Sequence, residues 1–261
     1  MKEARTSLGR SLRILEAVVQ SSAPRGISEL ARELGLDKSA VQRAFLGLTQ
    51  AGYLEKVPGG TRYRPTLRIW ELGTHVIAQH EACRLVHPML RYGAKLTGLT
   101  AYFAWEVAPE VIYLDKVEGE QGRMNSSLPG RRVAMYKTAA GQAVLAFLAA
   151  DRREAWIRTW IEETAGTAAA LQAEVLRANL EETRRRLYAQ SCSGTFAQVN
   201  GVAAPIWAQG AEPIGSLVLV GEAQILPETD FPKVGNIAVS LAEQATRALG
   251  GSYPGFLSDM H

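Results

Sequence analysis

Two pairs of side chains have the spacing of metal ligands on one helical face. Cys83 and His87 stand four residues apart, and Glu71 and His75 repeat that spacing. Residues at i and i+4 are neighbours on a helix, so each pair can approach a common ion. No third set of ligands with zinc spacing accompanies them, and a buried thiol beside a histidine is the favoured interpretation of the first pair. We expect no metal and no other cofactor, and a metal-binding regulator is kept as an alternative.

Catalytic motifs give no support for an enzyme. The chain has no G-x-S-x-G turn, no G-x-G-x-x-G fingerprint, no phosphate loop and no H-E-x-x-H pair. Its histidines are His75, His80, His87 and His261. None of them falls within residues 99–249, where Asp115 and Glu118 are the remaining candidates for acid–base chemistry. Isolated carboxylates at a strand end are usually surface residues, so a small-molecule-converting enzyme is an alternative and not the main expectation.

A different chemistry is offered by four polar side chains on one predicted helix, Lys38, Ser39, Gln42 and Arg43. They lie opposite an apolar stripe at positions 41, 44, 45 and 48, which follows the i, i+3, i+4, i+7 pattern. Asp37 can cap this helix and Gly52 closes it. Because the first two turns of a helix inserted in the major groove meet base edges, we predict that the four side chains read bases in DNA.

The neighbouring segments complete a winged helix-turn-helix. A short helix runs from Ser28, its expected cap, to Gly35, and a helix over residues 7–20 precedes it. Residues 53–65 form two extended runs around Pro58, Gly59 and Gly60, which is typical of a β-hairpin wing. The predicted phosphate contacts are Arg10, Arg13, Arg62 and Arg64.

Charge separates this segment from an ordinary three-helix packing unit, the alternative interpretation of its amphipathic helices. Residues 1–66 contain 11 Lys and Arg against 6 Asp and Glu, whereas the whole chain has 29 against 26. The remainder therefore carries a small negative balance. Phosphate neutralisation supplies most non-specific affinity for DNA, so the asymmetry favours double-stranded DNA as the partner.

Length and composition exclude several classes of protein. At 261 residues and 47% hydrophobic, the chain is long enough for about two globular domains. No apolar run approaches the roughly 20 residues that span a bilayer, and the first residues lack the apolar segment of a signal peptide. Cys83 and Cys192 lie too far apart in sequence to suggest a disulfide framework. We expect free thiols, no membrane partner and a cytoplasmic location.

Residues 67–83 form a predicted linker helix after the DNA-binding domain of residues 1–66. Trp70, Val76 and Ile77 would be costly to leave in water on a bare connector, so we expect this helix to pack on its counterpart in a second subunit. Two-fold pairing places two recognition helices about one or more DNA turns apart. The expected operator is therefore a palindrome or near-palindrome.

Residues 84–252 have the pattern of an α+β domain with an antiparallel sheet flanked by helices. A hairpin is predicted over residues 100–118, and further strands near Thr195 to Trp207 and Ile214 to Gly221. Predicted helices include Thr138 to Leu148, Asp151 to Glu163, Leu171 to Gln190 and a last one over residues 234–249, with an interruption near Pro88 in the preceding segment. Residues 253–261 are predicted to be a loose tail. The run from Arg184 to Arg186 is interpreted as a solvated helix face rather than an anion site.

Five segments together resemble the IclR-type transcriptional regulators from end to end: SLRILEAV, LGLDKSAVQRAFLGLTQAGYLEK, YLDKVEG, SSLPGRRVAMYKTAAGQAVLAFL and GVAAPI with GSLVLVG. The resemblance implies a repressor or activator with a GAF-like domain that binds a small organic effector, in a homodimer or a dimer of dimers. The family's pocket corresponds here to Tyr136, Thr138, Ala139, Ala140, Gly141, Val199, Asn200, Gly201, Val218 and Val220.

The helix beginning near Thr138 offers free backbone N–H groups and a positive dipole end, which suits a carboxylate. The alternative interpretation is a small-residue helix packed closely on the sheet. Two departures from the family's pattern matter: the loop before GVAAPI is short, and Val218 and Val220 replace residues that bear hydroxyl groups in some organic-acid sensors. A less polar pocket favours an effector with an apolar or aromatic body.

Overall fold

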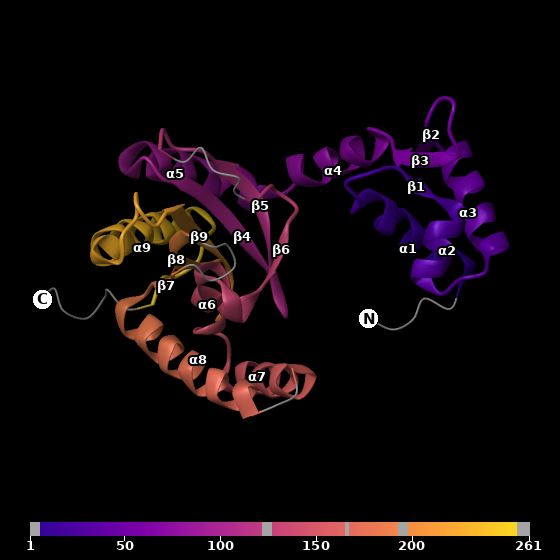
Figure 1. Ribbon diagram of the computed structural model, residues 1–261. Coiled ribbons are helices and arrows are strands. Elements are labelled where there is room, and N and C mark those ends of the chain that lie inside the picture. The colour runs from indigo at the N-terminus through magenta and orange to yellow at the C-terminus, as the bar shows by residue number, and fades with distance from the viewer. Residues whose placement is uncertain (1–5, 122–126, 165–166, 193–197, 255–261) are drawn as a thin grey trace, which may run out of the picture. The chain divides into compact units, whose positions relative to one another are not determined.

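The computed structural model describes residues 6–121, 127–164, 167–192 and 198–254. The chain divides into two compact units, residues 1–79 and 80–261, called here the N-terminal and C-terminal units (Figure 1). The division falls close to the predicted linker. No helix within the described segments is long and apolar enough to cross a lipid bilayer.

The N-terminal unit is a winged helix-turn-helix. Its elements are α1 (Ser7–Val19), β1 (Arg25–Gly26), α2 (Ile27–Leu34), α3 (Lys38–Gln50), β2 (Leu54–Lys56), β3 (Arg62–Pro65) and α4 (Arg68–Ala78). The strands form a three-stranded antiparallel sheet in the order β1-β3-β2. The core contains Ile14, Val18, Leu30, Ala31, Val41, Ala44, Phe45 and Leu54. Tyr63 of the wing packs edge-on against Phe45 at 4.8 Å between ring centres, so the wing is part of this core.

The turn between α2 and α3 follows the sequence pattern with one correction. Gly35 ends α2 with φ 63°, a left-handed conformation that favours glycine. The cap of α2 is Gly26 and not Ser28, because β1 pairs with β3 and runs directly into the helix. Asp37 occupies the cap position of α3, where its backbone carbonyl accepts the N–H of Val41 at 3.1 Å and its side chain makes no capping bond.

Helix α4 has no buried residue. The apolar side chains on it and at its start include Leu67, Trp70 and Val76, each more than 60% exposed. These side chains give α4 an apolar surface within the N-terminal unit.

The C-terminal unit is built on a six-stranded antiparallel sheet in the order β6-β5-β4-β9-β8-β7. Its strands are β4 (Thr100–Val107), β5 (Glu110–Val117), β6 (Arg132–Ala134), β7 (Ala189–Cys192), β8 (Val199–Trp207) and β9 (Pro213–Glu222). Its helices are α5 (Glu81–Thr97), η1 (Met135–Lys137), α6 (Ala139–Leu145), α7 (Ala150–Thr164), α8 (Thr167–Arg186), η2 (Glu228–Asp230) and α9 (Phe231–Ala248). The predicted α+β class with an antiparallel sheet is confirmed.

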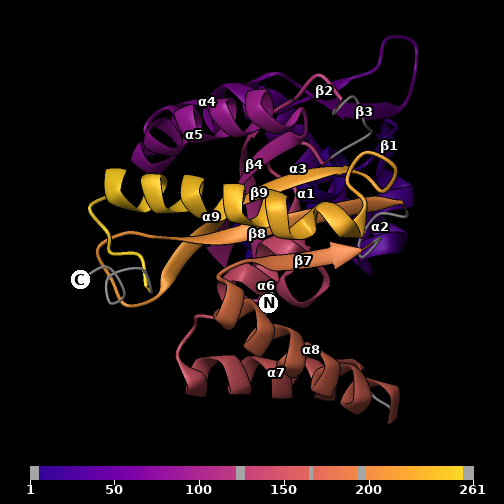
Figure 2. The same ribbon diagram turned by 90° about the vertical axis from the view of Figure 1, so that its left-hand side faces the viewer.

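Two hydrophobic clusters cover the two faces of this sheet. Helices α5 and α9 pack on one face, where Phe103, Val202 and Leu219 are buried. Helix α6, followed by α7 and α8, covers the other face, where Tyr102, Ala203 and Val218 are buried (Figure 2). Alternate residues of each strand therefore point to different helical layers.

Three features of the C-terminal unit differ from the sequence predictions. Helix α5 continues through Pro88 without interruption. Helix α8 ends at Arg186 because Leu187 has φ 63°, and Gln190 belongs to β7, which pairs with β8. The strand predicted from Thr195 begins at Val199 in the described residues, and positions 195–197 lie outside them. Of the predicted tail, residues 255–261 also lie outside the described part, while the Tyr253 ring packs on Trp207 at 5.0 Å.

Candidate functional site

The predicted base-reading side chains share the exposed surface of α3. Lys38, Ser39, Gln42 and Arg43 are all exposed, while Val41 and Phe45 on the same helix are fully buried. Burial of the apolar stripe fixes the rotation of α3 and turns the polar side chains outward. The recognition face, defined here as Lys38, Ser39 and Gln42, begins at the first turn of the helix.

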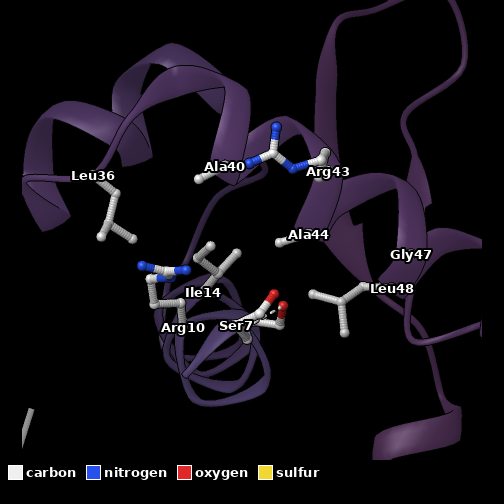
Figure 3. Close-up of a pocket in the computed structure, with 10 residues that line it drawn as sticks. Ser7, Arg10, Ile14, Leu36, Ala40, Arg43, Ala44, Gly47 and Leu48 are labelled. Carbon is white, nitrogen blue, oxygen red and sulfur yellow. Dashed lines mark hydrogen bonds between the residues drawn. The ribbon is translucent and has the colours of Figure 1, made fainter. Parts of the chain in front are cut away.

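A groove of about 240 Å³ separates α3 from α1 and contains two of the predicted DNA contacts (Figure 3). Arg10 from α1 and Arg43 from α3 both line it, over an apolar floor that includes Ile14, Ala44 and Leu48. Within the described residues, neither arginine has a carboxylate at ion-pair distance. Two guanidinium groups without a carboxylate partner in the described part of the chain therefore line one groove, although 33 residues separate them in the sequence.

Hydroxyl groups on α1 border the same groove and were missed by the sequence analysis. Ser7 and Ser11 line it beside Arg10, and the Ser11 hydroxyl donates to the Ser7 carbonyl at 3.1 Å. The signal was available, because positions 7, 10, 11 and 14 form one face of the predicted first helix.

Arg13 lies apart from this groove. It lines a second surface hollow with two carboxylates, Glu16 and Glu33, and with Arg25. A phosphate would meet negative charge there, so Arg10 and Arg13, predicted together as phosphate contacts, occupy different environments.

The wing arginines are exposed but paired. Arg62 lies 3.2 Å from a Glu29 carboxylate oxygen and donates to the Pro24 carbonyl at 2.9 Å. Arg64 donates to Glu55 across the hairpin at 2.6 Å. A phosphate that contacts either guanidinium must compete with these carboxylates. Because exposed ion pairs contribute little free energy, a phosphate can replace the carboxylate at small cost.

In the C-terminal unit, most of the predicted effector residues gather around the start of α6 and the sheet face beneath it. The Thr138 hydroxyl caps α6 by accepting the Gly141 N–H at 3.1 Å, and the Ser216 hydroxyl donates to the Ala140 carbonyl at 2.9 Å. A Cβ atom on Gly141 would lie 2.1 Å from the Met135 Cα, so no larger residue fits. The small residues of α6 therefore serve close packing on the sheet.

The strand residues of the predicted pocket divide between the two faces. Val218 is buried in the cluster that contains α6, and Gly201 stands opposite Val220 in the β8–β9 pairing. Asn200 points to the other face, where its side-chain amide donates to the Leu226 carbonyl at 3.0 Å. Strand alternation puts Val199 on the α6 side with Gly201. The term sheet-face region is used below for Thr138–Gly141 with Gly201, Val218 and Val220.

Two buried tyrosines adjoin this region and were missed from the sequence. Tyr102 and Tyr113 lie on paired strands with ring centres 4.8 Å apart, and the Tyr102 hydroxyl donates to the Ser127 carbonyl at 3.0 Å. Burial raises the pKa of Tyr113 well above its ordinary value. The Tyr113 phenol therefore stays neutral at physiological pH, and the two rings give this face an aromatic wall. The sequence signal was the alternation of side chains along each strand of the hairpin, which places Tyr102 and Tyr113 on the same face of the sheet.

Tyr136 separates from the other predicted effector residues. Its ring packs against Trp160 of α7 at 4.4 Å between centres, tilted by 30°, and it lines a different cavity with residues of α8.

The candidate metal and catalytic side chains are engaged with one another or with solvent. His87 Nδ1 lies 2.7 Å from an Asp115 carboxylate oxygen, and the other oxygen accepts the Lys116 N–H at 2.7 Å. Burial, with a smaller effect of the Asp115 charge, raises the pKa of the Cys83 thiol to about 11, so it stays protonated. Within the described segments, no group of three or more His, Cys, Asp or Glu is placed to hold a metal ion. Glu71 and His75 are exposed on α4, and Glu118 pairs with Lys116 at 2.6 Å.

Two arginines of the α8 run are held by backbone carbonyls, and the third, Arg185, is exposed. Arg184 donates to the Ala146 carbonyl at 2.6 Å, and Arg186 donates to the Tyr188 carbonyl at 2.8 Å. Arg185 pairs with Glu182 at 2.7 Å. These contacts make Arg184 and Arg186 structural groups rather than members of a solvated face.

Comparison with known proteins gives two matching family models. Residues 7–58 match the IclR helix-turn-helix domain, and residues 74–247 match the bacterial transcriptional regulator IclR C-terminal domain. Among curated relatives, the HTH-type transcriptional regulator XynR of Escherichia coli K12 is 26% identical over 95% of this chain and 98% of its own length. The transcriptional repressor IclR of the same organism is 25% identical over 94% and 90%.

Solved structures show the same fold. The IclR of Thermotoga maritima matches with a TM-score of 0.71 and 25% identity over 94% of this chain and 98% of that one. An IclR homologue of Microbacterium hydrocarbonoxydans, in complex with 4-hydroxybenzoate, matches with a TM-score of 0.76 and 20% identity over 94% and 99%. The two family models together cover both units, and the curated relatives are transcriptional regulators. The chain belongs to the IclR family of bacterial transcriptional regulators.

Proposed function

We propose that this regulator binds its operator with the recognition face of α3 in the major groove. Lys38, Ser39 and Gln42 present donors and acceptors from the first two turns, where a recognition helix meets base edges. The observation that carries the proposal is the exposure of these side chains beside the α1–α3 groove, in a segment with a surplus of positive charge.

Arg10 and Arg43, which line one groove, are proposed to contact a backbone phosphate. Arg43 was expected to read bases, but it lines the same hollow as Arg10 and so lies toward α1. Guanidinium groups that contact phosphates position a protein on the duplex and carry no sequence information.

Arginine substitutions test this assignment on specific and random DNA duplexes. Arg43→Ala and Arg10→Ala are each expected to lower the affinity for both duplexes by the same factor. Each should also reduce the slope of log affinity against log salt concentration by about one. Arg13→Ala removes the same charge from the same helix as Arg10 and serves as the matched control, with a smaller effect because Arg13 faces Glu16 and Glu33. If Arg43→Ala instead abolished discrimination between the duplexes in a footprinting assay, Arg43 would be a base contact.

Pairing of two copies through α4 would supply the symmetry that a palindromic operator requires. The exposed Trp70 and Val76 support this, since a second apolar helix would cover them. Trp70→Arg is expected to leave a monomer in sedimentation and to lower operator affinity, while the fold of both units is retained.

Control of DNA affinity by a small organic acid is proposed for the sheet-face region. The apolar side chains of Val218 and Val220 and the rings of Tyr102 and Tyr113 favour an effector with an apolar or aromatic body. The Microbacterium homologue that binds 4-hydroxybenzoate has the same fold, which supports an aromatic acid. An effector that binds one arrangement of two subunits more tightly shifts the spacing of the recognition helices and hence DNA affinity.

Calorimetry with 4-hydroxybenzoate and with glyoxylate tests the polarity of this region. We expect the aromatic acid to bind more tightly, and Val220→Thr, which adds a hydroxyl without changing the shape much, to weaken it. Binding of glyoxylate alone would overturn the effector class while leaving the DNA-binding proposal intact.

A further inference from the structure

A second cavity of the C-terminal unit lies between η1, α7 and α8 and has a volume of about 380 Å³. Its wall on the side of η1, α6 and α7 consists of Tyr136, Lys137, Gln142 and Trp160. The members of the sheet-face region, Thr138–Gly141, Gly201, Val218 and Val220, are not among its lining residues. It is therefore a separate place in the unit, and its occupation does not depend on the effector proposal above.

Aromatic rings make the inner wall of this cavity rigid. Tyr136 packs on Trp160 at 4.4 Å between ring centres, and Trp156 stacks on Trp160 at 6.4 Å with 12° between the ring planes. Trp160 is only 7% exposed. Its indole N–H is buried and has no acceptor among the described residues, so the wall also contains an unsatisfied donor. Stacked rings lose little conformational freedom when a ligand binds.

A free positive charge stands at the mouth. The Lys137 ammonium lies 5.3 Å from the centre of the Tyr136 ring, and the side chain is exposed. No carboxylate of the described residues pairs with it, whereas Arg177 and Arg185 on the adjacent α8 each pair with glutamate. The local charge pattern thus leaves Lys137 available to an anion.

Helix α8 supplies the outer wall with an apolar stripe between two amides. Gln172, Val175, Leu176 and Asn179 line the cavity at i, i+3, i+4 and i+7. Val175 is 55% exposed, although the cavity beside it is walled by aromatic rings. An apolar ligand in the cavity would cover this side chain, and the amides at either end can donate to or accept from its polar groups.

We propose that this cavity binds a small aromatic carboxylate. The carboxylate pairs with the Lys137 ammonium, the ring lies between Trp160 and Val175, and Gln172 or Asn179 contacts polar substituents. An aromatic body matches the apolar walls, and a single negative charge matches the unpaired cation. The site offers the regulator a second aromatic ligand, held by α7 and α8 rather than by the sheet.

Titration of the full chain with 2-naphthoate tests the proposal by calorimetry and by tryptophan emission, since Trp156 and Trp160 adjoin the cavity. Lys137→Met is expected to weaken binding about twofold to fivefold, the usual range for one exposed charge pair. Val175→Glu places a carboxylate on the exposed wall and is expected to weaken it about tenfold or more by repulsion and lost apolar contact. Naphthalene-2-carboxamide, which lacks the charge, should bind more weakly than 2-naphthoate to the natural chain.

Matched controls separate this site from others. Lys233→Met removes an exposed lysine from α9, and Ala178→Glu adds the same charge to α8 outside the cavity, so both should bind 2-naphthoate normally. Val220→Phe fills the sheet-face region and so removes any 2-naphthoate bound there, while the change in Trp156 and Trp160 emission should remain. Lys233→Met and Ala178→Glu should also retain DNA binding, and DNA binding by the natural chain is measured in parallel to separate failure here from failure of the regulator proposal.

Three results would overturn the proposal. The first is no binding of 2-naphthoate to the natural chain at millimolar concentration. The second is a tryptophan-emission change that survives Lys137→Met and Val175→Glu or that disappears with Val220→Phe, which would place the ligand on the sheet face. The third is a change of oligomeric state in Val175→Glu without any ligand effect, which would identify the exposed α8 surface as a contact with a second copy.

Discussion

The two units present their candidate sites in opposite ways. In the N-terminal unit, every predicted DNA contact is at least partly exposed and surrounds a small core of eight buried hydrophobic residues. In the C-terminal unit, Ala140 and Val218 of the sheet-face region are themselves part of a large buried cluster. Changes to the DNA surface should therefore affect binding without affecting stability, whereas changes to the sheet-face region should affect both.

The largest expected difference concerns the two cores. Phe45 and Phe103 are both fully buried, and truncation of either to alanine should cost about 3–5 kcal/mol. The hydrophobic core of a unit of fewer than 80 residues rarely contributes more than about 3–5 kcal/mol to the free energy of unfolding. Phe45→Ala should therefore unfold the N-terminal unit. The larger C-terminal unit should have a stability on the order of 10 kcal/mol and survive Phe103→Ala with a lower midpoint.

Chemical denaturation of Phe45→Ala and Phe103→Ala, monitored by hydrogen exchange in each unit, measures the stability that each unit retains. A native N-terminal unit in Phe45→Ala would contradict the small-core argument. Loss of both units together would show that they do not unfold independently.

Adding one methyl group to a glycine should have opposite effects on the stability of the two units. Gly141→Ala would drive a Cβ atom into the Met135 backbone and should destabilise the C-terminal unit by about 3 kcal/mol. Gly47 lies in α3 with nothing within 4 Å of the added atom, so Gly47→Ala should stabilise the N-terminal unit by about 0.5–1 kcal/mol through helix propensity. Thermal melts of the two variants should shift in opposite directions, and a shift in the same direction would refute the contrast.

The difference between the units also explains what the sequence could predict. Helical periodicity identifies which side of α3 is buried, and hence which of its side chains are exposed, because the apolar stripe at Val41, Ala44 and Phe45 is regular. Strand alternation is less informative where both faces are buried, as in β8, so the position of Asn200 on the α9 side could not be told from its neighbours.

Short strands and contacts between residues far apart in sequence were the other features that could not be predicted from the sequence. β1 and β6 have two and three residues, too few for any periodic pattern. The approach of Arg10 to the groove of Arg43 and the packing of Tyr136 against Trp160 depend on how helices cross, which local sequence does not encode.

The smallest expected effect concerns the paired wing. Glu29→Gln removes the carboxylate that holds Arg62 and keeps a group that can accept the Gly26 N–H. Freed from this pair, Arg62 should bind phosphate better and raise non-specific DNA affinity about twofold to fivefold at low salt.

Glu16→Gln is the matched control, because it removes the same charge from the N-terminal unit at an exposed position without an ion pair to a wing arginine. Equal gains in fluorescence-anisotropy titrations of the two variants would assign the effect to net charge alone. A larger gain in Glu29→Gln would assign it to release of Arg62.

The two-residue strand β1 has a consequence for the thermodynamics of DNA binding. An isolated hairpin is marginally stable in water, but β3 is paired on one edge with β2 and on the other with β1, which leads directly into α2. The wing is therefore preorganised relative to the helix-turn-helix before it meets DNA. Its backbone ordering entropy is already included in folding, so wing contacts contribute to affinity with little of the conformational cost that a flexible arm would incur on binding.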